Sequence, residues 1–199
     1  PPDRGGPEEQ GSRPEAHPVK GMEPLYPEIV VAGCGNPLYA DDGFGPAVVE
    51  SLQGLELPEN VKVIDAGLGG PHFVFTLLDP GSTKKLIIVD IADFGGEPGE
   101  LRWLAVDELP AGSYRDAHSW DLTEPLQRIK DRIDVTVVGC QPARVTDPDM
   151  EIGLSDEVSH AIPDTVQHVL KMIGVDYGTT LKCLQEDSQP GACTSPGKS

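Results

Sequence analysis

The sequence predicts an α/β fold: a three-layer αβα sandwich around a mostly parallel central sheet of about five strands and an edge strand. Short apolar runs rich in Val and Ile alternate with segments of helical periodicity. This order is typical of parallel strands whose two faces are covered by helices. The first apolar run ends in glycines just before a helix, as strand-to-helix turns in such folds do. The chain has 199 residues, enough for one domain with a buried core.

Each predicted element has its own signal. Strands are predicted where aliphatic and β-branched residues run together, and helices where apolar residues recur every three or four positions. The last helix begins after Ser155 with two acidic residues and ends before Gly174, which fits an N-cap and a C′ position. The predicted strands are 29–32, 61–64, 86–89, 100–105 (the edge strand) and 135–138, and the predicted helices are 46–52, 73–78, 122–130 and 155–173.

Two segments at the ends of the sequence lack this periodicity. Residues 1–21 are rich in Pro, Gly, Glu and Arg and precede Met22, so we expect a disordered or artificially added extension. After Tyr177 the composition changes to Thr, Gly, Ser, Gln and Pro, so residues 176–199 are predicted to form a flexible tail. Residues 22–175 then make up a single folded domain.

The chain is strongly acidic. Its net charge is −18 at pH 7, and residues 22–175 carry 26 acidic and 10 basic side chains, so the acidity belongs to the predicted domain. Such a surface repels nucleic acid phosphates and anionic membranes, and no basic patch with interleaved aromatic residues favours nucleic acid binding. Because salt screens repulsion between like charges, we expect the stability of the fold to rise with ionic strength.

Cysteine usage and the apolar runs predict a cytoplasmic location. None of the four cysteines belongs to a Cys-x-x-Cys pair, and no signal peptide is recognisable. We expect Cys34 and Cys140, which stand at the ends of apolar strands, to be small buried residues and not thiolates. The longest apolar runs have the length of strands, well below the roughly 20 residues that span a bilayer.

The loop at residues 33–45 places two carboxylates where a helix begins. A helix N-terminus normally favours an anion such as phosphate. This loop, however, has Leu38 where a dinucleotide fingerprint needs its third glycine, and Asp41 and Asp42 would repel a pyrophosphate. The two acids therefore favour a metal cation over a nucleotide.

Three acids follow predicted strands: Asp42, Asp65 and Asp90. In open parallel sheets the ligand site lies beyond the carboxyl ends of the strands, and carboxylates that converge there need a proton, a hydrogen bond or a cation. His118, in the polar loop before the third helix, could reach across this crevice to a metal. A single Asp at a strand end commonly caps the next helix, and this is the alternative for Asp65 and Asp41.

Several short motifs follow one another along residues 27–173. They are GCGNPLYADDGFG (33–45), VIDAG (63–67), LIIVD (86–90), GEPGE (96–100), AHSWDL (117–122), VVGCQP (137–142) and GLSDEV (153–158). In this order they resemble the hydrogenase maturation protease family, the endopeptidases that trim the C-terminus of NiFe hydrogenase large subunits. The first and fifth motifs look most like the branch that serves the deazaflavin-reducing hydrogenases of methanogens.

The resemblance implies a function for the chain. It implies a cytoplasmic, aspartate-dependent endopeptidase that removes the C-terminal extension of a nickel-loaded precursor of the hydrogenase large subunit. The family's metal ligands map to Asp42, Asp90 and His118, and a further acid linked to substrate handling maps to Asp65. Nickel would arrive with the precursor, because two carboxylates and one imidazole form an incomplete shell that need not hold a metal tightly alone.

The remaining site residues are expectations of the same kind. Asp42 and Asp65 are expected to be catalytic by orienting a water molecule, and Asn36, Asp41 and Gln141 are expected to contact the substrate. No Gly-x-Ser-x-Gly elbow is present and no Ser or Cys has an evident base partner, so nucleophilic catalysis is not expected. The expected partner is the large-subunit precursor, with no nucleic acid or membrane, and the protease is expected to be a monomer.

Two other classes of function share features with this one. A nucleotide-binding α/β domain would have the same order of strands, although the acidic pair counts against it. A non-catalytic assembly chaperone would have the same metal-binding residues and would deliver nickel without shortening the precursor.

Overall fold

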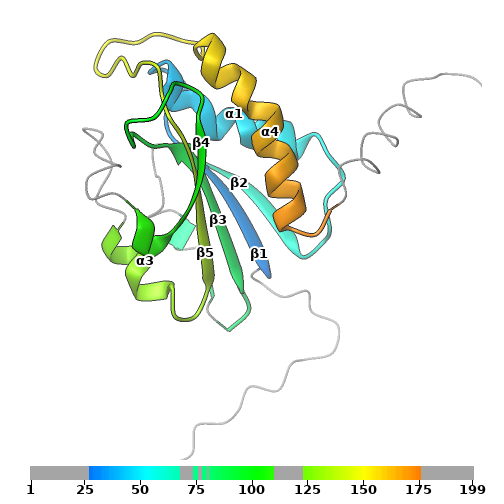
Figure 1. Ribbon diagram of the computed structural model, residues 1–199. Helices are drawn as coiled ribbons and strands as arrows, with labels where there is room; N and C mark the ends of the chain where they lie inside the picture. The colour runs from blue at the N-terminus through cyan, green and yellow to red at the C-terminus, as the bar shows by residue number, and fades with distance from the viewer. Residues whose placement is uncertain (1–26, 68–73, 76–77, 80, 110–122, 176–199) are drawn as a thin grey trace, which may run out of the picture.

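A computed structural model describes residues 27–67, 74–75, 78–79, 81–109 and 123–175 of the chain (Figure 1). These residues form one central sheet with helices on both of its faces, as the sequence predicts. The strands are β1 (Ile29–Cys34), β2 (Val61–Gly67), β3 (Lys85–Ile91), β4 (Leu101–Ala105) and β5 (Asp134–Cys140). The helices are α1 (Phe44–Gln53), α3 (Thr123–Ile129) and α4 (Asp156–Met172), with short 3-10 helices η1 (Asp41–Gly43) and η2 (Val106–Glu108).

The strand order is β2-β1-β3-β5-β4, so β4 is the edge strand that the sequence predicts, and it pairs antiparallel with β5. The other neighbouring strands are parallel. The chain therefore leaves β1 toward β2 on one side and returns to β3 on the other side. This reversal between β1 and β3 is the position at which open α/β sheets bind ligands. Asp42 lies in η1, in the turn after β1, and Asp90 lies in β3, so both predicted site residues come from segments next to this reversal.

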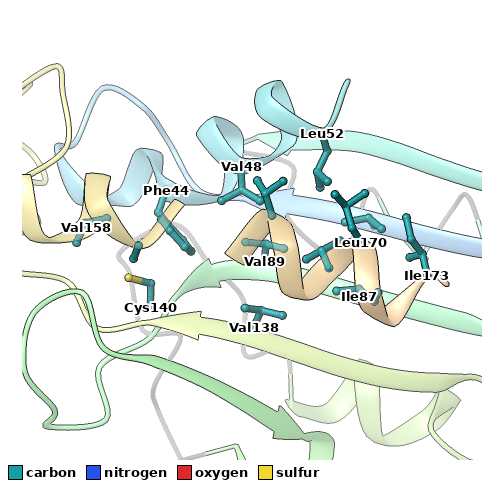
Figure 2. Close-up of a cluster of buried hydrophobic side chains, with 14 residues drawn as sticks. Phe44, Val48, Leu52, Ile87, Val89, Val138, Cys140, Val158, Leu170 and Ile173 are labelled. Atoms are coloured by element: carbon teal, nitrogen blue, oxygen red, sulfur yellow. The ribbon is translucent and has the colours of Figure 1, made fainter. Parts of the chain in front are cut away.

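The two faces of the sheet bury separate hydrophobic clusters. Alternation along β3 sends Ile87 and Val89 toward α1 and α4, and Leu86 and Ile88 toward α3. Figure 2 shows the first cluster, in which side chains from α1 and α4 pack over the strands. Because the central strands are buried on both faces, they are almost continuously apolar, which explains the short Val- and Ile-rich runs in the sequence.

Close backbone packing fixes α1 on β1. A Cβ atom at Gly33 would lie 2.3 Å from the backbone oxygen of Gly45, and one at Gly45 would lie 2.2 Å from the backbone oxygen of Cys34. Only glycine allows this approach. The helix begins at Phe44, two residues before the predicted start, because Pro46 is tolerated within the first helical turn.

The ends of α4 follow the predicted signals. Ser155 is the N-cap, and its hydroxyl accepts from the backbone N–H of Val158 at 3.4 Å. Gly174 follows the helix with a φ of +81°, the left-handed conformation expected at C′. The helix continues through Pro163, so this proline does not end it as proline commonly does.

Other boundaries differ from the prediction in length. Strand β2 continues to Gly67, three residues beyond the predicted end, because Asp65 and Gly67 still pair with Gly33 and Cys34 across a bulge. Of the predicted helix 73–78, the structure describes residues 74–75, which are helical, and residue 78, which is not; the rest lies outside the described residues. The predicted extensions 1–21 and 176–199 also lie outside the described residues. None of the helices in the described ranges has the length and apolar character needed to cross a bilayer.

Candidate active site

The turn after β1 holds the carboxylate of Asp42 beside the end of that strand. Gly35 has a φ of +113°, and a Cβ atom there would lie 2.0 Å from the backbone oxygen of Asp42. The backbone N–H of Asn36 donates to Asp42 Oδ2 at 2.8 Å, and both side chains are buried. Glycine is therefore required where the loop folds back, and the loop in turn fixes the predicted metal ligand and catalytic residue Asp42.

Ala40, the residue before the two aspartates, has a strained backbone. Its φ of 55° and ψ of −118° are unusual for a residue with a side chain, a strain of about 1–3 kcal/mol. Two backbone hydrogen bonds hold this conformation: Ala40 N–H donates to the Glu151 carbonyl at 2.7 Å, and the Ala40 carbonyl accepts from Gly43 N–H at 3.0 Å. The rest of the fold thus maintains the sharp turn that carries the acidic pair.

Asp41 is fully buried and organises the loop between β5 and α4. Its Oδ2 accepts from the backbone N–H groups of Ala143 and Arg144 at 2.8 and 2.9 Å and from Ser155 Oγ at 3.1 Å. Its Oδ1 accepts from the backbone N–H of Ser155 at 2.6 Å. Four donors satisfy this carboxylate inside the protein. A direct contact with substrate, which the sequence predicts for Asp41, would require this network to open.

Asp90 is buried near the carboxyl end of β3. Its Oδ1 accepts from the backbone N–H of Ile91 at 2.8 Å. Because Val89 packs toward α1 and α4, the alternation of the strand directs Asp90 to the opposite face, which also carries Cys34. Asp90 therefore projects to the face of the sheet that carries α3.

Asp65 lies on the other face of the sheet. It pairs in register with Gly33, and its neighbour Val63 packs in the cluster under α1 and α4, whereas Ile64 and Ala66 pack on the α3 face. The side chain of Asp65 is exposed, and its Oδ1 accepts from the backbone N–H of Gly67 at 2.8 Å. Asp65 thus holds its own turn and keeps an exposed carboxylate on the α1 side.

The pKa values of the two buried cysteines are raised, in part by these acids. Burial raises the pKa of the Cys34 thiol well above its ordinary value, and the negative charges of Asp90, Asp65 and Asp42 raise it further. Burial, with a smaller contribution from Asp41, raises the pKa of Cys140 to about 12. Both thiols are protonated near neutral pH, so neither is the nucleophile of a peptidase. This agrees with the predicted role of the two cysteines as small buried residues.

Gln141 fastens the segment that follows β3. Its Oε1 accepts from the backbone N–H groups of Phe94 and Gly96 at 3.0 and 3.1 Å, and its Nε2 donates to Asp93 Oδ1 at 3.1 Å. Asn36 is similarly engaged, because its Oδ1 accepts from the backbone N–H of Leu38 at 3.1 Å. Both residues, which the sequence predicts to contact the substrate, hold the loops that border Asp42 and Asp90.

The metal-ligand set is divided between described and undescribed parts of the chain. Asp42 and Asp90 lie near the strand ends that flank the reversal of the sheet, whereas His118 lies outside the described residues. Among the residues whose placement is described, no group of three or more His, Cys, Asp or Glu side chains is arranged to hold a metal ion. The two carboxylates have the chemistry of divalent-cation ligands.

Residues 46–172 match the family model HycI, described as hydrogenase maturation protease. The match covers more than half of the chain and contains two of the three acids that follow strands. The chain belongs to the hydrogenase maturation protease family.

Similar proteins extend this result beyond the matched residues. The chain is 47% identical over 156 residues to the coenzyme F420 hydrogenase subunit delta of Methanothermobacter thermautotrophicus, a match that covers 76% of this chain and 98% of the relative. A hydrogenase 2 maturation peptidase from Thaumarchaeota archaeon SCGC_AB-539-E09 is similar in structure, with 30% identity, a TM-score of 0.55 and coverage of 75% of this chain and 99% of that one. The hydrogenase maturating endopeptidase HybD from E. coli gives 26% identity and a TM-score of 0.59, with coverage of 75% and 95%.

Sequence reasoning missed the donors that organise this hydrogenase maturation protease. Ser155 was predicted as an N-cap, which is confirmed, but its two hydrogen bonds to Asp41 were not foreseen. The other donors to Asp41 are backbone N–H groups of Ala143 and Arg144, which carry no side-chain signal. The GLSDEV motif that contains Ser155 was the one available hint that this position does more than begin a helix.

Proposed function

We propose that this protein removes the C-terminal extension of the large-subunit precursor of a deazaflavin-reducing NiFe hydrogenase, and that it acts on the precursor that already carries nickel. Membership of the maturation protease family supports the peptidase activity. The 47% identity to the F420 hydrogenase subunit delta supports the choice of hydrogenase. The observation that carries the proposal is the placement of Asp42 in the turn after β1 and of Asp90 near the end of β3, the two strands that flank the reversal of the sheet.

Carboxylates in this position suit a metal-bearing substrate. Their oxygens are ligands for divalent cations, and we propose that Asp42 and Asp90, with His118, complete the coordination of nickel carried by the precursor. Nickel held in this way could polarise the scissile carbonyl or lower the pKa of a bound water molecule. The protein would supply negative charge, fixed orientation and a hydrogen-bond acceptor for the water.

The described part of the chain offers no competing nucleophile among its cysteines. Cys34 and Cys140 are buried, and the raised pKa of each thiol keeps it protonated. We therefore propose that the attacking group is a water molecule oriented by Asp42, whereas Asp65, on the opposite face of the sheet from Asp90, contacts the substrate. Asp41, with its four internal donors, is assigned to the support of Asp42.

The mass of the large subunit tests the proposal. Purified precursor, prepared with and without nickel, is incubated with the wild-type protein and with the Asp42→Asn and Asp90→Asn variants. We expect the mass to fall by that of the C-terminal extension only for nickel-loaded precursor and wild-type protein. An unchanged mass in all samples would support a chaperone that delivers nickel without cleavage. Cleavage of nickel-free precursor in the presence of a chelator would refute the nickel requirement.

A further inference from the structure

A groove runs along the side of α1, on the face of the sheet that carries Asp65. Its volume is about 480 Å³, and its walls come from the loop after β1, from α1, from the end of β2 and from the loop before α4. Gly43 belongs to the wall and directly follows the acidic pair, so one part of the groove lies next to the turn that carries Asp42. The lining includes Pro37, Gly43, Glu50, Asp65, Ile152 and Leu154.

One rim of the groove exposes apolar side chains. Ile152, which lines the groove, is 80% exposed, and nearby Met150 is 73% exposed. The rim is held by backbone hydrogen bonds on both sides of Glu151, whose N–H donates to the Leu38 carbonyl at 2.8 Å and whose carbonyl accepts from Ala40 N–H at 2.7 Å. Apolar side chains held in water by a fixed backbone are typical of a surface that a partner covers.

Another part of the groove lining carries negative charge. Glu50 and Asp65 line it, both are exposed, and neither forms an ion pair with any residue in the described ranges. No Lys or Arg is present among the lining residues. The groove therefore complements a segment that combines an apolar side chain with a basic one.

From this combination we infer that the groove binds an extended peptide segment next to the scissile bond of the precursor, with an apolar side chain against Ile152 and a basic side chain between Glu50 and Asp65. The inference rests on the proposed function, since the precursor is the peptide that this protein cleaves. The division of the acids follows from it: Asp65 acts on the bound segment from the α1 side, whereas Asp42 and Asp90 act at the metal.

Direct binding and cleavage are measured separately with the same proteins. The probe for binding is a fluorescent peptide that copies the last residues of the mature large subunit together with its extension, and cleavage of the nickel-loaded precursor gives kcat and KM. We expect Ile152→Ser and Glu50→Lys each to weaken peptide binding and to raise KM about tenfold, with kcat within twofold of wild type. Peptide affinity should fall with added KCl for the wild type, and less steeply for Glu50→Gln.

Two control variants lie outside the groove lining. Val145→Ser removes an exposed apolar side chain from the same loop, and Glu56→Gln removes an exposed acid from the region after α1, so we expect both to leave peptide affinity and KM unchanged. If the wild type cleaves the precursor and the KM values of Ile152→Ser and Glu50→Lys equal that of the wild type, the inference is overturned. Failure of the peptide to bind the wild type would also overturn it. If the wild type binds the peptide through the groove residues but never shortens the precursor, the proposed function fails and the binding groove stands.

Discussion

Asp65 and Asp90 lie near the ends of the two strands on either side of β1, yet they project from opposite faces of the sheet. Asp65 pairs with Gly33, whereas Val89, the residue before Asp90, is the partner of Gly33 on the other side. Paired residues of parallel strands project to the same face, so Asp90 projects to the other one. The two acids occupy equivalent positions in the sequence pattern, but their side chains lie in different environments. Substitutions at the two positions are therefore expected to affect the activity in different ways.

Replacing Asp90 or Asp42 with Asn should lower the rate of precursor processing about 10- to 100-fold, because an amide oxygen binds a cation more weakly than a carboxylate does. His118→Ala should do the same. Asp65→Asn should instead act mainly on KM, because Asp65 lines the groove. Rates are followed by mass spectrometry of the large subunit, with circular dichroism as the check on folding. Wild-type rates in Asp42→Asn and Asp90→Asn would contradict the site assignment.

Replacing Asp41 with Asn should destabilise the fold by about 3 kcal/mol, because an amide NH₂ group would face donors that now meet carboxylate oxygens. Ser155→Ala removes one donor and the N-cap of α4 but keeps the backbone bond to Asp41, so its cost should be smaller, about 1–2 kcal/mol. Urea unfolding gives both values. Equal costs for the two variants would show that the backbone donors matter less than their geometry indicates.

Replacing Gly35 with Ala should abolish processing, because its Cβ atom would collide with the backbone of Asp42 and displace that carboxylate. Gly174→Ala is the matched control, since Gly174 also has a positive φ but has nothing within 4 Å of an added Cβ atom. The control should lose stability by about 1 kcal/mol and keep its activity. Comparable activity in the two variants would mean that the close approach is not needed for catalysis.

Stability should decline at alkaline pH in a way that depends on Cys140. Its pKa is raised to about 12 in the folded protein, so the unfolded chain loses this proton first, and the contribution of Cys140 to stability falls as pH rises from about 9 toward 12. Cys140→Ala removes the titrating group. Urea midpoints measured between pH 8 and pH 10.5 should therefore fall less steeply in the variant than in the wild type. Parallel curves would refute this assignment.

Added KCl should raise the melting temperature, because the acidic domain repels itself and salt screens that repulsion. A variant with Glu56→Gln and Glu59→Gln, two exposed acids after α1, should melt higher at low salt and gain less from added salt. Melting is recorded from 0.05 to 2 M KCl. If the melting temperature of the wild type stays constant or falls as KCl is added, repulsion between the acidic side chains does not destabilise the fold. That result would favour a role of the acidic surface in docking a basic face of the precursor.

The sequence could predict the sheet and the positions of Asp42 and Asp90, because apolar periodicity and strand-end acids are local signals. The order of the strands could not be read, since it depends on which strand lies on each side of β1. The separation of Asp65 from Asp90 follows from that order and from the register. The hydrogen bonds that hold Asp41 could not be predicted from the sequence either, because two of its partners are backbone N–H groups about 100 residues away in the chain.

The bond between Asp41 and Ser155 joins positions that are 114 residues apart in the chain. A polypeptide that is still being made has both Asp42 and Asp90 long before it has the start of α4. Domains generally fold as units, so the hydrogen bonds from Ser155 to Asp41, which support the turn that carries Asp42, can form only late in synthesis. We therefore expect a partly translated chain that lacks α4 to be inactive even when it contains Asp42 and Asp90.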